Sequence, residues 1–289
     1  MNACQQAGKT VFELAGVMPN PRTEKVYEGI HICKEQHIDF ILAVGGGSVI
    51  DCAKAIAVGA KTGKDFWETF YVQQEEATEA LPLGTILTMS ATGTEMNGNT
   101  VVSNREKHEK HGYSSAFLFP VFSILDPTYT YSLPADQTAY GAVDILAHVF
   151  EQYFSFPNED NLSDNLSEAV MRSVIDNIET AIREAHNYTA RSNIMWASTM
   201  ALNTLIGMGK EQDRTSHNIE HALSGLYDIP HGAGLAIVFP ARMEYVYKAG
   251  LPKFVRYAKQ IWGVNGDGKS DEEIALEGIM KTKQFFKKI

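Results

Sequence analysis

Residues 39–47, DFILAVGGG, form an almost wholly apolar run that ends in three glycines. Such a run is typical of a parallel strand buried on both faces of a sheet. The next residues have helical spacing, with Ile50, Ala53 and Ala57 on one side of the expected helix. The other elements expected in this part of the chain are a short strand at 10–17, a helix at 23–36 and strands at 81–90 and 119–127. This alternation predicts an α/β fold with a parallel sheet.

The pattern changes after Pro134. Helical spacing dominates from there on, and we expect no strand. The helices are expected at 136–154, 161–185 and 189–207, with further helices beyond 212. Ser270 and Glu273 have the spacing of a capping box, which marks the start of a helix. We therefore predict two domains, an α/β domain at 1–134 and an all-helical domain at 135–289.

The three glycines suggest a ligand. Glycines let a phosphate approach the backbone closely, and the N-terminus of the following helix offers free N–H groups. Because ligands of open α/β sheets bind where strands end, the loop favours a phosphate or dinucleotide over a simple tight turn. A second stretch, TMSATGTEMNGNT, follows the next expected strand. Its hydroxyl and amide groups suit a ribose, a diphosphate or a nicotinamide amide, although an ordinary solvated loop has similar composition.

Asp144 and His148 are four residues apart in the helical segment GAVDILAHVFEQY, so they lie on one face of the helix. Glu151 lies close to the same stripe, and we expect it beside the site or facing solvent. Such an acid–histidine pair is often only a structural hydrogen bond. The segment from His217 to Pro240 favours a metal site over this structural interpretation, because it places more histidines in apolar surroundings.

His217 and His221 form another pair four residues apart, and His231 follows at a turn. Burying several imidazoles is costly unless they have partners, and a divalent metal is one such partner. An aspartate with histidines suits zinc or iron. Spacing alone does not decide which histidines bind, since His221 is either a ligand or a neighbour of the ligands. The remaining histidines lie in polar stretches and are expected on the surface: His31, His37, His108, His111 and His186.

The formal net charge of −10 argues against nucleic acid or an anionic membrane as the main partner. The three cysteines are odd in number and contain no CxxC, which fits a reducing compartment. No apolar run is long enough to span a membrane, and the first residues lack the layout of a signal peptide. These features predict a cytoplasmic protein.

Five motifs together resemble the iron-containing (group III) alcohol dehydrogenases, and in particular their butanol dehydrogenase-like branch. They are AVGGGSVIDCAKAIA, ATGTEMN, ILDPTYTYSLP, GAVDILAHVFEQY and HNIEHALSGLYDIPHGAGLAIVFP. The resemblance implies a Rossmann-like dinucleotide-binding domain followed by an all-α metal domain, the fold shared with dehydroquinate synthase. The active site is then expected in the cleft between the two domains.

The resemblance also implies roles for single residues. The metal ligands correspond to Asp144, His148, His217 and His231. His221 corresponds to a histidine beside the nicotinamide and is expected to relay a proton. The residues that correspond to cofactor contacts are Asn20, Gly46, Gly47, Ser48, Asp51, Thr88, Thr92, Asn97 and Lys110.

The activity implied is that of a metal-dependent NAD(P)(H) alcohol dehydrogenase or aldehyde reductase for short- to medium-chain substrates such as butanol and butanal. The expected metal is Fe²⁺ or Zn²⁺, the cofactor NADP(H) or NAD(H), and the assembly a homodimer. The alternatives are a zinc-dependent polyol dehydrogenase of the same fold, a helical metal-dependent hydrolase and an inactive fragment. The glycine loop favours a dehydrogenase, because a hydrolase does not need it.

The sequence departs from the family pattern in two ways. Both ends look shortened, so the first strand with its glycine turn and the C-terminal end are expected to be missing. Arg214, in QDRTSHNIEH, stands where this branch is expected to carry a bulky aromatic residue. The change is expected to alter the shape of the pocket.

Overall fold

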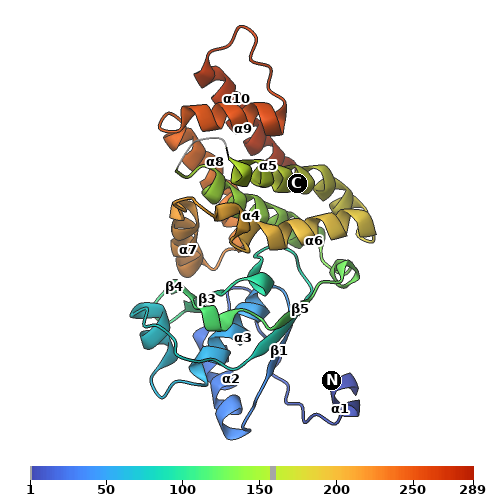
Figure 1. Cartoon of the computed structure of the whole chain (residues 1–289), viewed down its shortest axis with the longest axis vertical. Helices are drawn as coiled ribbons and strands as arrows, with labels where there is room; N and C mark the ends of the chain where they lie inside the picture. Colours follow the sequence, from blue (N-terminus) through green and yellow to red (C-terminus); the bar gives the residue numbers. More distant parts are fainter. Residues whose placement is uncertain (1, 157–160) are drawn as a thin grey trace.

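The computed structural model describes residues 2–156 and 161–289, and the chain falls into an α/β half and a helical half (Figure 1). The α/β half contains a parallel sheet in the order β1-β2-β5. Its strands are β1 (Ile41–Gly45), β2 (Leu83–Leu87) and β5 (Phe122–Ile124). Their register aligns Val44 with Ile86 and Ile86 with Ile124. All three correspond to predicted strands, so the predicted α/β fold is confirmed.

Helix α3 (Gly47–Gly59) begins directly after β1, as the glycine run predicts, and most of its residues are buried. Helix α2 (Thr23–Glu35) packs against it, and the two approach so closely that glycine is required. A Cβ on Gly59 would lie 2.3 Å from Cδ1 of Ile30. The shorter helices of this half are α1 (Asn2–Gln6), η1 (Trp67–Val72), η2 (Thr94–Met96), η3 (Ala116–Leu118) and η4 (Pro127–Thr130).

Two features of this half differ from the prediction. Residues 10–17, expected as a short strand, have no regular structure, and Gly16 there has a φ of 82°. An antiparallel hairpin, β3 (Asn99–Asn104) and β4 (Glu109–Ser114), was not predicted. Its second strand reads EKHGYS, so the apolar alternation that identifies strands is absent. The hairpin covers α3 on one side and contacts α7 on the other.

One face of the sheet is apolar and exposed, so the prediction that the strand before the three glycines is buried on both faces is wrong. Leu42 and Val44 of β1 are 39% and 55% exposed, and Phe122 and Ile124 of β5 are 46% and 45% exposed. These residues alternate along their strands, so they lie on the same face. The opposite face packs against α3.

The helical half is built around α4 (Ala135–Tyr153), which is buried along most of its length. Its neighbours are α5 (Leu162–Arg183), α6 (Tyr188–Leu202) and α8 (His231–Val246). The remaining helices are η5 (Leu205–Gly207), α7 (Thr215–Tyr227), α9 (Leu251–Trp262) and α10 (Asp271–Lys288). The core of this half includes Leu146, Phe150 and Phe239. The capping box predicted at Ser270 and Glu273 is present at the start of α10.

The two halves meet where β2 ends. A Cβ on Gly141 of α4 would lie 2.3 Å from the carbonyl oxygen of Ser90, so the loop after β2 packs directly on this helix. The same loop is bonded to α6, because the Oγ1 of Thr199 donates to Oε1 of Glu95 at 2.6 Å. The described strands all precede α4, which begins at Ala135. In the described parts of the chain, we find no helix with the length and apolar character to cross a membrane.

Candidate active site

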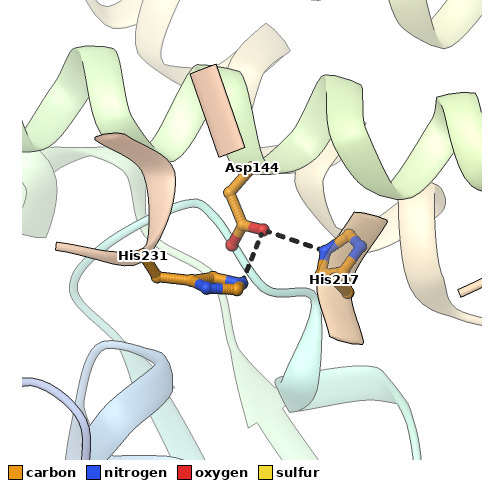
Figure 2. A group of neighbouring side chains, drawn as sticks. All are labelled: Asp144, His217 and His231. Carbon is orange, nitrogen blue, oxygen red and sulfur yellow. Dashed lines mark ion pairs between the residues drawn. The ribbon is translucent and has the colours of Figure 1, made fainter. Parts of the chain in front are cut away.

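Three imidazoles converge on the carboxylate of Asp144, which is 3% exposed. Its Oδ1 lies 3.2 Å from Nε2 of His148, one turn further along α4. The same oxygen lies 3.6 Å from Nε2 of His217 on α7 and 3.6 Å from Nε2 of His231, the first residue of α8. Figure 2 shows Asp144 between His217 and His231. The imidazole of His148 stacks on that of His217, with ring centroids 4.5 Å apart.

Asp144, His217 and His231 bring ligand atoms within 4.8 Å of one another, close enough to share a metal ion, and His148 adds a nitrogen 3.2 Å from the same carboxylate oxygen. Within the described residues, Oδ1 of Asp144 and Nε2 of His217 are buried and have no hydrogen-bond partner. Leaving such atoms unpaired is costly unless a cation binds them. Around a tetrahedral ion with bonds of about 2.0–2.2 Å, ligand atoms lie about 3.3–3.6 Å apart. The separations from Oδ1 to the three nitrogens match this spacing, and an O/N donor set suits iron or zinc.

Two buried glutamates bind two of the imidazoles at Nδ1, the ring nitrogen that does not face Asp144. Oε2 of Glu151 lies 2.7 Å from Nδ1 of His217, and its Oε1 accepts the backbone N–H of His217 at 3.1 Å. Glu220 is hydrogen-bonded to Nδ1 of His231 and to the hydroxyl of Ser224. A proton on each Nδ1 leaves each Nε2 lone pair free to face Asp144. Glu151 was expected beside the site or facing solvent, and it is buried.

Sequence reasoning missed Glu220. Its only signal is its place between His217 and His221 in HNIEH, which gives no hint that the side chain turns toward His231. Lys110 adds a positive charge nearby, with Nζ 3.5 Å from both Oε2 of Glu220 and Nδ1 of His231. The predicted metal set therefore sits inside a second layer of buried charged groups.

The charges of the site shift its pKa values. Burial favours neutral Asp144, but the imidazoles of His148 and His231 outweigh burial and hold its pKa well below the usual range. Burial also lowers the pKa of His217, yet the carboxylates of Asp144 and Glu151 outweigh it and raise the pKa to about 9. Burial and the positive charge of Lys110 lower the pKa of His231.

His221 stands apart from this set. Its ring centroid lies 5.4 Å from that of His231 and 6.3 Å from that of His217. Burial and the nearby Lys110 hold its pKa well below the usual range, so the imidazole is neutral at neutral pH. A neutral imidazole both donates and accepts a proton, which suits the relay predicted for it.

A cavity of about 380 Å³ lies between the two halves, and most of the predicted site residues line it. From the helical half it is lined by His148, His217, His221 and His231, among others. The predicted cofactor residues that line it are Asn20, Gly47, Ser48, Asp51, Thr92, Asn97 and Lys110. Gly46 and Thr88 are not among its lining residues. Gly46 is the N-cap of α3, and the backbone N–H of Thr88 donates to the carbonyl of Gly45 at 3.0 Å.

The ammonium group of Lys54 fixes the loop that carries Thr92 and Asn97. Lys54 is completely buried. Its Nζ lies 2.6 Å and 2.8 Å from O and Oγ1 of Thr94, and 2.7 Å and 2.9 Å from the carbonyl oxygens of Asn97 and Asn99. The carboxylate of Asp51, one turn earlier on α3, accepts from Oγ1 of Thr94 at 2.7 Å. The start of α3 and the loop after β2 thus form one bonded unit.

Asn20 and Asp228 join the two halves behind His231. The amide of Asn20 donates to Oδ1 of Asp228 at 3.2 Å, and its Oδ1 accepts from Lys110 at 3.1 Å. Arg22 and Arg105 each lie 3.2 Å from Oδ2 of Asp228. Asp228 follows the last residue of α7 and lies three residues before His231. These bonds therefore connect the α/β half to the turn that carries His231.

Comparison with known proteins shows the family of the chain. Residues 1–127 match the family model described as iron-containing alcohol dehydrogenase, and residues 138–289 match that of the Fe-containing alcohol dehydrogenase family, C-terminal. The probable NADH-dependent butanol dehydrogenase 1 of Bacillus subtilis (strain 168) is 48% identical over 281 residues, covering 97% of this chain and 72% of that protein. The NADPH-dependent aldehyde reductase YqhD of Escherichia coli (strain K12) is 38% identical over 284 residues, covering 98% and 73%.

A solved structure is similar over nearly the whole chain. The crystal structure of NADH-dependent butanol dehydrogenase A from Thermotoga maritima has a TM-score of 0.95 and 43% identity, covering 99% of this chain and 71% of that chain. The matches confirm the predicted fold, the predicted enzyme class and the predicted dependence on a metal and NAD(P). The chain belongs to the iron-containing alcohol dehydrogenase family.

Proposed function

We propose that this chain interconverts short- to medium-chain primary alcohols and aldehydes, such as butanol and butanal, with NADH or NADPH. The metal ion, Fe²⁺ or Zn²⁺, is held by Asp144, His148, His217 and His231. The observation that carries the proposal is the convergence of three Nε2 atoms on one unbonded carboxylate oxygen at 3.2–3.6 Å. The names of similar proteins support the substrate class, since they include butanol dehydrogenases and an aldehyde reductase.

When bound, the metal supplies a Lewis acid for the substrate oxygen and the nicotinamide supplies the hydride carrier. The residues of the chain provide orientation and proton transfer. Glu151 and Glu220 keep the Nδ1 protons of His217 and His231 in place, so both rings present Nε2 to the site. His221 lines the cavity as a neutral imidazole, and we assign it the exchange of a proton with the substrate oxygen.

The cofactor is proposed to lie along the α/β side of the cavity. Its diphosphate approaches Gly46, Gly47 and Ser48, where α3 begins with free N–H groups. The other proposed contacts are Asn20, Asp51, Thr88, Thr92, Asn97 and Lys110. We further propose a homodimer in the cytoplasm, with domains at 1–134 and 135–289.

Metal removal tests the proposal. The protein is stripped with a chelator, reloaded without oxygen with Fe²⁺ or Zn²⁺, and assayed by the loss of NADH or NADPH absorbance with butanal. We expect oxidation of the cofactor that requires both metal and aldehyde, and restoration by one of the two metals. Activity that persists after chelation, or cofactor oxidation that does not depend on aldehyde, contradicts the proposal.

A further inference from the structure

Most of the cavity-lining residues that the helical half adds around the metal site carry polar side chains. Apart from the three ligand histidines and Glu151, this half contributes Gln152, Leu202, Gln212, Arg214, Asn218 and His221. Leu202 is the one aliphatic side chain among these six. These polar side chains offer hydrogen-bond partners to a polar substituent on a substrate.

Arg214 brings a positive charge to this wall. It directly precedes α7, three residues before His217. The residue is exposed and also lines the cavity, which places it where the cavity meets solvent. A guanidinium group offers five N–H donors in a planar fork that matches a carboxylate.

The charge of Arg214 has no ionic partner in the described parts of the chain, although carboxylates lie close in sequence and in the cavity. Asp213 is bound by Arg242, and its Oδ1 also accepts from N and Oγ1 of Thr215 at 2.9 Å and 2.5 Å. Glu151 is engaged by His217. These two acids are thus already engaged, and no ion pair joins Arg214 to a carboxylate among the described residues, so its charge is available to a ligand.

We propose that Arg214 binds an oxyanion at the far end of the substrate, so that this enzyme favours short aldehydes and alcohols that carry a carboxylate at the end opposite the reacting carbon. The proposal rests on the proposed function and narrows its substrate class. Arg214 is then a specificity-determining residue. An aromatic side chain at this position would offer apolar surface to an uncharged chain, whereas arginine offers charge-assisted hydrogen bonds.

The phosphates of the cofactor are the other oxyanions that enter the cavity. Gly47 and Ser48, at the N-terminus of α3, line the α/β side. Arg214 belongs to the helical side, next to the turn of α7 that carries His217. Arg214 is therefore better placed to bind a carboxylate of the substrate than the diphosphate of the cofactor. The KM of the substrate and the KM of the cofactor distinguish these two oxyanions.

The test compares butanal with 4-oxobutanoate, which has the same carbon chain and a terminal carboxylate, on the metal-loaded enzyme. We expect kcat/KM to be about tenfold to a hundredfold higher for 4-oxobutanoate, and its KM to rise with salt. Arg214→Gln should remove this preference by raising the KM for 4-oxobutanoate far more than the KM for butanal, with the KM of the cofactor unchanged. Arg214→Lys should retain part of the preference, and Arg214→Trp should reverse it. Arg183→Gln, a change at an exposed arginine of α5, is the matched control.

Calorimetric binding of succinate, an unreactive dicarboxylate, gives a readout that does not need turnover. Wild type and Arg214→Lys should bind it and Arg214→Gln should not, with unchanged melting temperatures. A preference for butanal in the wild type, or succinate binding that survives Arg214→Gln, overturns the proposal. A rise in the KM of NADH or NADPH in Arg214→Gln instead assigns the residue to the cofactor phosphates and also overturns it. Succinate binding without reduction of either aldehyde contradicts the proposed function alone.

Discussion

Glu151 holds His217 at two points, one on the backbone and one on the ring. Its Oε1 accepts the backbone N–H at 3.1 Å and its Oε2 lies 2.7 Å from Nδ1. The two residues come from α4 and α7, so this pair also fixes one ligand helix against the other. Because Nδ1 is engaged, Nε2 is the nitrogen left to face Asp144 at 3.6 Å.

Replacing Glu151 by glutamine should weaken metal binding. The amide either donates to Nδ1, which favours the wrong tautomer, or turns its oxygen there and loses the charge. Loss of such a supporting group typically costs about 10–100-fold in metal affinity. Competition titration of Fe²⁺ or Zn²⁺ against a chromophoric chelator measures it. Glu179→Gln, at an exposed acid of α5 paired with Lys288, should leave the affinity unchanged. Equal affinities in all three proteins would show that Glu151 has no role at the site.

Replacing His148 by alanine should remove the metal without unfolding the α/β half. His148 supplies the nitrogen nearest to Oδ1 of Asp144, at 3.2 Å, and comes from the same helix. Elemental analysis after purification in excess metal should show a metal content close to zero. Binding of the cofactor by the α/β half should persist. His31→Ala, at a surface histidine paired with Glu35, is the control and should keep its metal. Normal metal content in His148→Ala would remove this residue from the ligand set.

Two pairs with helical spacing, Asp144 with His148 and His217 with His221, were together enough to nominate a metal site, because residues four apart share a helix face. Spacing did not reveal how His231 approaches, since that depends on how α8 packs against α4. Glu220 lay outside prediction for the same reason. Lys54 was visible only as a polar residue beside Asp51, because its partners lie 40 to 45 residues later in the chain.

Among the strands, β1 and β2 were predictable because each is a continuous apolar run, although one face of β1 is exposed. The hairpin of β3 and β4 was not, since pairing between Val102 and His111 depends on tertiary contacts with α3 and α7. Residues 10–17 show the opposite error. Their apolar and β-branched residues have no neighbouring strand to pair with, and without a partner the segment does not form one.

Replacing Lys54 by methionine should destabilise the α/β half and loosen the loop that faces the cofactor. The change removes a buried ammonium and its hydrogen bonds to the carbonyl oxygens of Thr94, Asn97 and Asn99. Breaking a buried charged network of this kind costs about 3–5 kcal/mol. Urea unfolding measures the loss, and the KM for NADH or NADPH should rise in the fraction that remains folded. Lys61→Met, which removes an exposed lysine 3.7 Å from Glu79, should change neither quantity. An unchanged cofactor KM would limit Lys54 to a role in stability.

The carboxyl group of Asp51 should make stability depend on pH. Burial raises its pKa from 3.8 to about 6, although Lys54 and the hydroxyl of Thr94 act in the opposite direction. Between these two values the folded chain keeps a proton that the unfolded chain has released. Stability from this group is therefore present at low pH and is lost as pH rises through 6.

Asp51→Asn isolates this effect, because asparagine cannot titrate. We expect the unfolding free energy of the wild type minus that of the variant to fall between about pH 4.5 and pH 6.5 and then to level off. Urea unfolding of both proteins at matched ionic strength measures the difference, and Asp176→Asn on α5 serves as the control, with no such trend expected. A difference that rises with pH over this window would mean that the hydrogen bonds from Thr94 and Val101 outweigh burial, so that Asp51 is ionised throughout.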